Sequence, residues 1–451
     1  MARREANGLL AALLGEADWT GGELARAVNA LGTAQGLRLR YDRTSVAHWL
    51  TGSRPRPPVP DLVAAAFSRR VGRLVLPAET GLAADTRLGA PVLDPGAGAA
   101  SAALGLIALC RAEALPEQRA VLTRSGYTPT APPLPGGHTP LTPPPSAASG
   151  AVHRVLPEDV RLLREMARVY AVLSRGHGGA HARSALAAYI GDDAGRVLGA
   201  TGPDRLPEEA RVAVAQLVHL LAVMTADAGH DGLAQRYFSS ALSLAREVGD
   251  RRQYAITLRA MSSQALRLLH RRHADVLAHA ALTVHGDEAD PTVRSYLLAQ
   301  RALTSAHRGE RREALADLAD AARLHERAVH EGAPFTAYPR SGLHYQRAEV
   351  FQALGDESEG RAALRSALAH RPPGDHRPVA LTHARLAESL LRIGHLDVAC
   401  GHWSSFLDHY PHLHSRQVDQ ALAELVRRLR PHQRQRHAAA ILDRARELRR
   451  R

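Results

Sequence analysis

The densest group of side chains that could ligate a metal lies between residues 400 and 414. Its members are one cysteine and four histidines: Cys400, His402, His409, His412 and His414. A zinc site needs four ligands that converge tetrahedrally, and proteins usually supply them as close pairs such as C-x-x-C. Here the spacing is irregular and runs through an expected helix and a proline turn. Because the chain contains 25 histidines, chance groupings are expected, and we predict no metal and no cofactor.

Motifs for covalent or phosphate chemistry are also missing from the sequence. All 58 residues counted as lysine or arginine are arginines, so a phosphate-binding loop that ends in G-K-[ST] is impossible. No G-x-S-x-G nucleophile motif occurs. The carboxylates are spread along expected helix faces beside arginines, which is typical of ordinary i, i+4 ion pairs. We therefore predict that the protein is not an enzyme.

Three polar side chains near residue 45 could instead hydrogen-bond to the edges of DNA bases. Arg43, Thr44 and His48 fall on or near the outer face of a short expected helix that Asp42 can cap. Arginine prefers guanine, and a hydroxyl can pair with either a donor or an acceptor. Arginines that could contact phosphates flank this helix on both sides: Arg38, Arg40, Arg54 and Arg56. The sequence leaves open whether Ser45 joins the outer face or is a buried cap residue.

Two expected helices must position these side chains. The first opens with Thr20-Gly-Gly-Glu23, a capping box in which a hydroxyl and a carboxylate satisfy the free N–H groups of the helix end. Apolar residues at helical spacing are predicted to face a core: Leu24, Val28 and Leu31 in the first helix, and Val46, Trp49 and Leu50 in the second. Gly52 stands just past the end of the second helix. Such a helix, polar outside and flanked by arginines, suits a DNA major groove between two rows of phosphates.

The segment TSVAHWLTGSRPRP, which starts at Thr44, resembles the recognition helix and following turn of the XRE/Cro-type helix-turn-helix family. In that family a buried Trp-Leu pair is followed by glycine and a basic turn that contains proline. The run from Asn29 to Tyr41 is longer than the three- to four-residue turn of the simple motif. Either the first helix continues to about Gln35 and the GLRLRY segment forms an arm, or the two helices pair in a non-standard way.

The whole arrangement, with helical repeats behind the first ~80 residues, resembles the NsdA-like regulators of actinomycetes. That resemblance implies a cytoplasmic protein linked to the control of sporulation and antibiotic production. It rests on motifs only in the N-terminal part, and elsewhere on architecture alone.

Composition and charge bound the remaining expectations. Apolar residues make up 45% of the chain and aromatic ones only 4%, which favours helices packed on helices. The net charge of +13 lies at the two ends: residues 1–75 hold eleven arginines against six acids, and residues 427–451 hold ten against two. One explanation of this arginine excess is biased codon usage, which adds arginines to solvated helix faces without a function. The other is that the two termini bind phosphate groups. For the C-terminal tail we favour simple solvation of the last helix.

Two distant cysteines, Cys110 and Cys400, argue for a reducing compartment. The N-terminus lacks the pattern of a signal peptide, and the apolar stretch from Ala97 to Cys110 is too short to span a bilayer. We therefore expect a soluble, cytoplasmic protein that does not contact a membrane.

Four segments are predicted along the chain. They are a helix-turn-helix domain at 1–82, a connector with short helices at 83–127, a Pro-rich linker at 128–150 and a helical-repeat domain at 151–451. Small or polar turns followed by Ala-rich helices recur in the last segment, at Gly229, His270, Gly309, Gly355 and Gly394. They are 41, 39, 46 and 39 residues apart, somewhat more than the ~34 of a tetratricopeptide repeat, which the pattern resembles. Stacked hairpins of this kind form a superhelix with a concave groove.

These observations predict an all-α protein that binds double-stranded DNA sequence-specifically as a homodimer and regulates transcription. A dimer is expected because one small domain rarely buries enough surface for useful specificity. The repeat groove is expected to serve dimerisation or to take a peptide, a protein or a small-molecule effector. The alternative is a protein-interaction scaffold whose N-terminal helices do not read DNA sequence.

Overall fold

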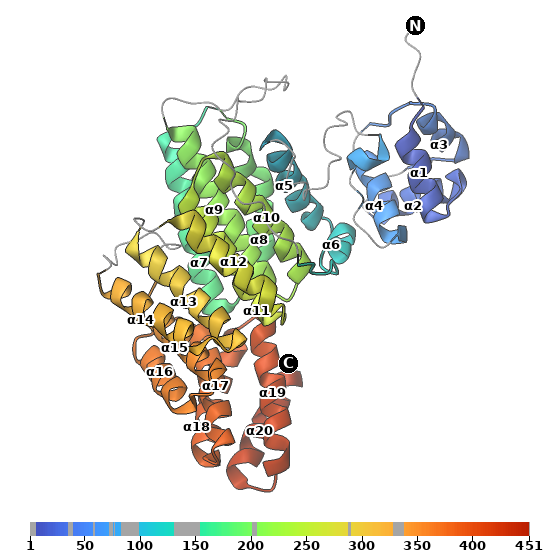
Figure 1. Cartoon of the computed structure of the whole chain (residues 1–451). Helices are drawn as coiled ribbons and strands as arrows, with labels where there is room; N and C mark the ends of the chain where they lie inside the picture. The colour runs from blue at the N-terminus through green and yellow to red at the C-terminus, as the bar shows by residue number, and fades with distance from the viewer. Residues whose placement is uncertain are drawn as a thin grey trace.

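The computed structural model describes residues 6–34, 39–56, 59–71, 75, 77–82, 99–129, 154–200, 205–286, 290–327 and 338–450. Within these ranges the protein is all-α, as predicted, and contains no strand. Figure 1 shows a small group of helices at the N-terminus, set beside a long array that holds the rest of the chain. The two parts have separate hydrophobic cores.

The N-terminal domain consists of α1 (Gly8–Ala17), α2 (Gly21–Ala34), α3 (Arg43–Leu50), α4 (Val59–Val71) and the 3₁₀ turn η1 (Pro77–Thr80). The predicted core residues meet here: Leu24, Val28, Leu31, Val46 and Trp49 are buried, and Leu50 is half-buried. Helices α1 and α4 complete the core with residues that include Leu10 and Phe67. A helix pair alone would leave this apolar seam in water, so the two further helices are what make the small domain stable.

The connector contains α5 (Ala99–Ala114) and α6 (Pro116–Leu122), and α5 packs against the first helices of the array. Its Glu113 is almost completely buried, where it forms an ion pair with Arg183 and accepts a hydrogen bond from the Tyr237 hydroxyl. Leu106 and Leu109 of α5 belong to the main core of the array. Residues 130–150 of the predicted Pro-rich linker lie outside the described residues.

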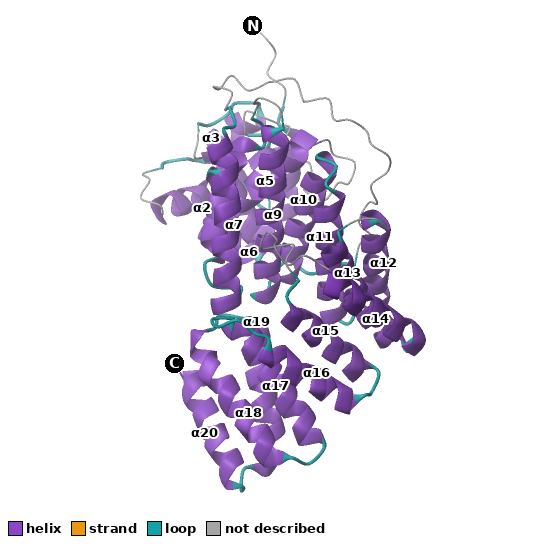
Figure 2. Ribbon diagram, turned by 90° about the vertical axis from the view of Figure 1, so that its left-hand side faces the viewer, coloured by secondary structure: helices purple, strands orange, loops and turns teal. Residues whose placement is uncertain are grey.

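The array begins with α7 (Pro157–His177), α8 (Arg183–Asp192) and η3 (Ala194–Val197). Five antiparallel pairs follow: α9 (Leu206–Asp227) with α10 (Asp231–Glu247), α11 (Arg251–Arg267) with α12 (Arg271–His285), α13 (Pro291–Arg308) with α14 (Arg311–Arg327), α15 (Arg340–Ala353) with α16 (Glu357–Ala369), and α17 (His376–Arg392) with α18 (Leu396–His409). The chain ends with η4 (Tyr410–His412), α19 (Arg416–Leu429), η5 (Arg430–His432) and α20 (Arg436–Arg450). Figure 2 shows these helices stacked along one direction, which is the form of a helical-repeat array.

Each pair turns at the position that the repeat pattern predicted. Gly229, Gly309, Gly355 and Gly394 adopt positive φ just after the first helix, between 83° and 87°. The amide after each of these residues bonds back to a carbonyl in the last turn of that helix, as in a Schellman motif. In the α11–α12 turn the positive φ belongs to Leu269, at 67°, one residue before the predicted His270. The structural repeat is therefore more regular than the sequence indicated.

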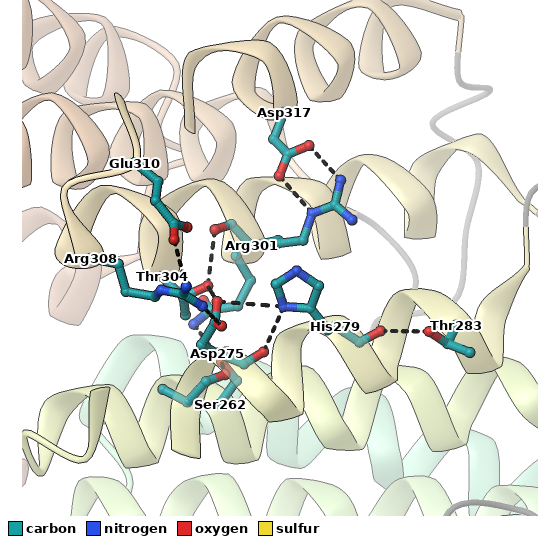
Figure 3. Close-up of polar contacts among 11 residues, drawn as sticks. Ser262, Asp275, His279, Thr283, Arg301, Thr304, Arg308, Glu310 and Asp317 are labelled. Atoms are coloured by element: carbon teal, nitrogen blue, oxygen red, sulfur yellow. Dashed lines mark hydrogen bonds and ion pairs between the residues drawn. The ribbon is translucent and has the colours of Figure 1, made fainter. Parts of the chain in front are cut away.

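Ion pairs join neighbouring helices of the array, as Figure 3 shows for α12, α13 and α14. The Arg301 guanidinium donates two hydrogen bonds to Asp317 at 2.7 and 2.6 Å, which joins α13 to α14. Asp275 of α12 pairs with Arg308 and accepts a hydrogen bond of 3.1 Å from the Thr304 hydroxyl, which joins α12 to α13. Arginines and carboxylates in this region thus hold the array together.

Among the described helices, α9 is apolar and long enough to cross a bilayer by length and composition. Of its most apolar window, 67% is buried inside the protein. It packs against α7 and α10, which identifies it as the central core helix of the array.

Candidate nucleic-acid interface

Helix α3 is fixed at its start by a complete capping box. The Asp42 carboxylate accepts hydrogen bonds from the Ser45 amide and from the Ser45 hydroxyl, both at 2.8 Å. The Ser45 hydroxyl in turn faces the Asp42 amide at 3.3 Å, and these bonds lower the pKa of the Asp42 carboxyl. This settles the role of Ser45, which is a half-buried cap residue of α3. Its side chain points into the helix end and leaves the outer face to its neighbours.

Helix α2 is capped in the same way. The Glu23 carboxylate accepts hydrogen bonds from the Thr20 amide and hydroxyl, each at 2.7 Å, and the Glu23 amide donates to the Thr20 hydroxyl at 3.4 Å. The capping box that the sequence predicted is therefore present. These bonds lower the pKa of the Glu23 carboxyl, with the Thr20 backbone bond as the largest cause.

The long segment between the two helices is anchored by one amide side chain. Asn29 of α2 donates to the Tyr41 carbonyl at 2.8 Å and accepts from the Tyr41 amide at 2.9 Å. The Tyr41 ring packs edge-on to Trp49, with 5.0 Å between ring centroids. Helix α2 is described as far as Ala34, which agrees with the longer first helix of the first alternative, whereas part of the arm in that alternative lies outside the described residues. Residues 35–38, which include Arg38, lie outside the described residues.

The inner side of α3 is held by close packing on α2. Trp49 is 4% exposed and Val46 is fully buried. A Cβ at Gly21 would stand 3.3 Å from the Val46 side chain, so glycine allows α2 to approach α3 closely. The α3 carbonyl of Leu50 accepts a hydrogen bond of 2.8 Å from the amide of Asn7, whose side chain caps α1 and donates to the Thr80 carbonyl. Helix α3 is thereby tied to the whole domain and cannot rotate independently.

The outer face of α3 presents the predicted base-reading side chains. Arg43, Thr44 and His48 are all exposed, together with Ala47 and, just past the helix, Thr51. Arg40 precedes the helix and Arg54 and Arg56 follow it, all three exposed. Among the described carboxylates, none lies within ion-pair distance of Arg40, Arg43 or Arg56. The site therefore offers a short polar helix face with arginines before and after it.

Two anchors of this site, Asn29 and Asn7, were not identified from the sequence. Each uses both ends of its amide to join segments that are far apart in the chain. The only sequence signal for Asn29 is an amide within the apolar run Ala27-Val28-Asn29-Ala30-Leu31, and Asn7 has the type of a helix cap. Neither signal specifies the distant partner.

The histidine-rich group at 400–414 does not converge on one point. His402 pairs with His383, His409 and His412 lie beside His376, and His414 stacks on His181. Cys400 is buried in the core between α17, α18 and α19. Among the described residues no group of three or more histidines, cysteines or carboxylates is arranged to hold a metal ion.

Comparison with known proteins bears on the N-terminal domain alone. Residues 10–83 match the family described as the SP15 N-terminal domain. The match begins within α1 and ends just after η1, so it covers the residues that form the separate N-terminal core. No curated protein matches the chain.

Proposed function

We propose that this protein is a transcriptional regulator that reads a DNA sequence through α3. The observation that supports the proposal most directly is the exposed face of Arg43, Thr44 and His48 on a helix that is capped at its start and packed on α2. An α-helix with its side chains is about 10–12 Å across, which fits the ~12 Å width of a major groove. The proposal includes the resemblance to XRE/Cro-type and NsdA-like regulators, which leads us to expect a cytoplasmic protein.

The roles of the flanking arginines follow from where they lie. Arg40 stands before α3, while Arg54 and Arg56 follow the turn at Gly52, so positive charge is available at both ends of the helix. In the proposal these arginines bind phosphates on the two sides of the groove and Arg43 donates to a guanine. Arg38 is expected to act with them. The helical array supplies dimerisation or binds an effector, and two copies would read two half-sites.

The test is selection of binding sites from a random duplex library by the full-length protein at near-physiological salt. The wild-type protein is expected to enrich a defined motif, and R43A/H48A is expected to lose it. The matched control is Arg272→Ala, an exposed arginine on α12, which removes a charge and leaves α3 unchanged. A control variant that loses the motif equally, or a wild-type protein that enriches none, would contradict the proposal.

The salt dependence of binding separates base contacts from phosphate contacts. Arg54→Ala and Arg56→Ala should each weaken binding to every sequence and lower the slope of log affinity against log salt by about 1. Arg43→Ala should instead relax the base preference at one position of the motif, at a cost of about 1–3 kcal/mol.

The second candidate function is a protein-interaction scaffold. It is favoured by the helical array itself, because stacked helix pairs of this kind present extended surfaces to partners. A scaffold predicts weak DNA binding that rises steeply at low salt without any sequence preference. The library selection therefore distinguishes the two functions directly.

A further inference from the structure

The concave side of the helical array forms a groove of about 1350 Å³. Its wall comes from one helix of each successive pair, from α7 and α9 through α11, α13 and α15 to α17. Three carboxylates line it, Asp227, Glu349 and Asp375. Against them stand six arginines: Arg175, Arg259, Arg267, Arg371, Arg377 and Arg385. The groove is thus basic, although the middle of the chain is close to neutral.

The three carboxylates of the groove are already engaged. Arg377 donates to Asp227 at 2.6 Å, Arg385 donates to Glu349 at 2.6 Å, and Arg175 lies 3.4 Å from Asp375. Arg267 is neutralised by Asp231, just outside the groove. That leaves Arg259 and Arg371, neither of which forms an ion pair with any carboxylate that the structure describes.

Arg259 lies among neutral groups. Its guanidinium sits over the Tyr296 ring, 3.9 Å from the centroid, and donates to the Gln346 side chain at 2.7 Å. The Gln346 side chain in turn donates a hydrogen bond to the Gln300 side chain at 3.1 Å. The Gln300 oxygen also accepts a hydrogen bond from the Ser263 hydroxyl at 2.9 Å. This chain of amides fixes the guanidinium without neutralising its charge, because every partner is uncharged.

Arg371 lies in the segment between α16 and α17 and forms no ion pair with a described carboxylate. Its guanidinium carbon lies 6.0 Å from the centre of the Tyr345 ring, and that of Arg385 lies 5.3 Å from the same ring. Burial lowers the pKa of the Arg371 guanidinium. Two guanidinium groups therefore lie near one aromatic ring, and of the two only Arg385 forms an ion pair with a described carboxylate.

The buried polar atoms that lack a partner point to the chemistry of a ligand. Within the described residues, the Nε atoms of Arg259, Arg371 and Arg377 and the hydroxyl of Tyr338 are buried without a hydrogen bond, and all four residues line the groove. Tyr338 is only 6% exposed. Three of these atoms are pure donors and the fourth can donate, so a ligand that satisfies them must supply acceptors.

We propose that this groove binds a small organic anion that carries at least two acidic groups, carboxylate or phosphate. Guanidinium groups fit both acids because each presents oxygens to the planar fork of donors. Donors alone do not suit a peptide backbone, whose N–H groups need acceptors, and the carboxylates of the groove are occupied by arginines. The site stands on the array alone and does not depend on whether α3 reads DNA.

The experiment is titration calorimetry of the full-length protein with citrate, ATP and hexaglutamate at constant ionic strength. Citrate represents the carboxylate class, ATP the phosphate class and hexaglutamate an acidic peptide. We expect citrate or ATP to bind with one-to-one stoichiometry. Arg371→Gln and Arg259→Gln should each weaken that binding about ten- to hundred-fold, because each removes a charged hydrogen-bond donor.

Arg272→Gln is the matched control, since it removes an exposed arginine of α12 outside the groove. Arg371→Gln should fold normally because no ion pair is lost, and thermal melting without ligand verifies this for each variant. The proposal is overturned if neither citrate nor ATP binds, if hexaglutamate alone binds, or if Arg272→Gln weakens binding as much as the groove variants do.

Discussion

Arginines of the N-terminal domain and arginines of the helical array stand in different surroundings. Around α3, Arg40, Arg43 and Arg56 are exposed and form no ion pair with a described carboxylate. In the array, by contrast, many arginines form ion pairs that join one helix to another. Examples are Arg301 with Asp317, Arg308 with Asp275, Arg377 with Asp227, Arg392 with Glu357 and Arg444 with Asp408. Arginine is thus exposed to solvent without an ion pair around α3, whereas in the array it often links two helices.

The contrast explains why total charge is a poor guide to function in this chain. An arginine that pairs with a carboxylate of another helix is largely neutralised locally and adds little to the external field. In the basic C-terminal tail, Arg427 and Arg428 share the single carboxylate of Glu424, so part of that charge is compensated as well. The proposed binding surfaces therefore rest on where an arginine without a described carboxylate partner lies: on or beside the outer face of α3, and at Arg259 and Arg371 in the groove.

The largest predicted effect concerns the independence of the two regions. Trp49→Ala should destabilise the N-terminal domain by about 3–5 kcal/mol, because Trp49 is 4% exposed at the centre of its own core. The array should keep its stability, since its core shares no residue with that domain. Hydrogen exchange should report faster exchange in α1–α4 alone.

Trp403→Ala, in the core of α17–α20, is the matched variant and should leave exchange in α1–α4 unchanged. Equal exchange changes in both regions would show that they unfold as one unit.

A second prediction compares a buried ion pair with an exposed one inside the array. Asp227 is 4% exposed and accepts hydrogen bonds from Arg377 at 2.6 Å, from Ser415 at 2.8 Å and from the Gly179 amide at 2.7 Å. It joins α9 to α17 and α19. Asp227→Ala should cost about 3–5 kcal/mol, because it leaves the half-buried Arg377 without its partner.

The matched control for that variant is Asp320→Ala. Asp320 pairs with Arg323 on the exposed face of α14, where more than half of both side chains is in water. The cost there should be about 0–1 kcal/mol in a urea titration. If the two variants lose equal stability, burial of the ion pair does not determine its contribution, and the prediction is wrong.

The two regions should also differ in how acid affects them. The Nδ1 atoms of His383 and His402 lie 2.9 Å apart, so one neutral ring donates to the other, and burial lowers the pKa of His383 to about 4. Unfolded histidines bind protons near pH 6.5, so the array should lose stability as pH falls from 6.5 towards 4 and keep it above 6.5. The slope contributed by one such histidine is at most about 1.4 kcal/mol per pH unit.

His383→Gln should make this slope shallower in urea titrations of the array between pH 7.5 and 4.5. The N-terminal domain should lose stability only at lower pH, because Glu23 and Asp42 have lowered pKa values and contribute as long as they stay ionised. An unchanged slope in the variant would assign the acid sensitivity to other histidines of the array.

Much of the fold follows from local sequence signals, whereas the long-range contacts do not. The caps at Thr20 and Asp42 and the glycine turns at Gly309 and Gly355 are visible in the sequence because one residue type meets one backbone requirement. Helix spacing likewise places Trp49 inside. The Asn29 anchor needs a partner twelve residues away, which no local pattern specifies.

The groove arginines illustrate the same limit over a longer range. Arg259 and Arg371 are far apart in sequence, and whether each has a carboxylate partner depends on the stacking of α11 against α15 and on the path of the chain into α17. The histidines at 400–414 are close together in the sequence, but in three dimensions each lies beside a histidine from another segment: His181, His376 or His383.

The smallest predicted effect tests the regularity of the array itself. Leu269 occupies the position that glycine holds in the four other turns, with φ at 67° and 78% of its surface exposed. A left-handed conformation costs a residue with a Cβ about 1–2 kcal/mol, and glycine avoids this cost. Glycine also loses more backbone entropy on folding, which offsets part of the gain in stability. Leu269→Gly should therefore raise the free energy of unfolding by about 0.5–1 kcal/mol.

Gly309→Ala is the reverse substitution in the next turn, where no atom lies within 4 Å of the added Cβ and φ is 85°. It should lower the free energy of unfolding by about 1 kcal/mol through backbone strain alone. Urea titrations of the two variants should thus move in opposite directions. If Leu269→Gly also destabilises the array, the leucine contributes packing that outweighs its strained backbone, and the turn of the α11–α12 pair is not equivalent to its four counterparts.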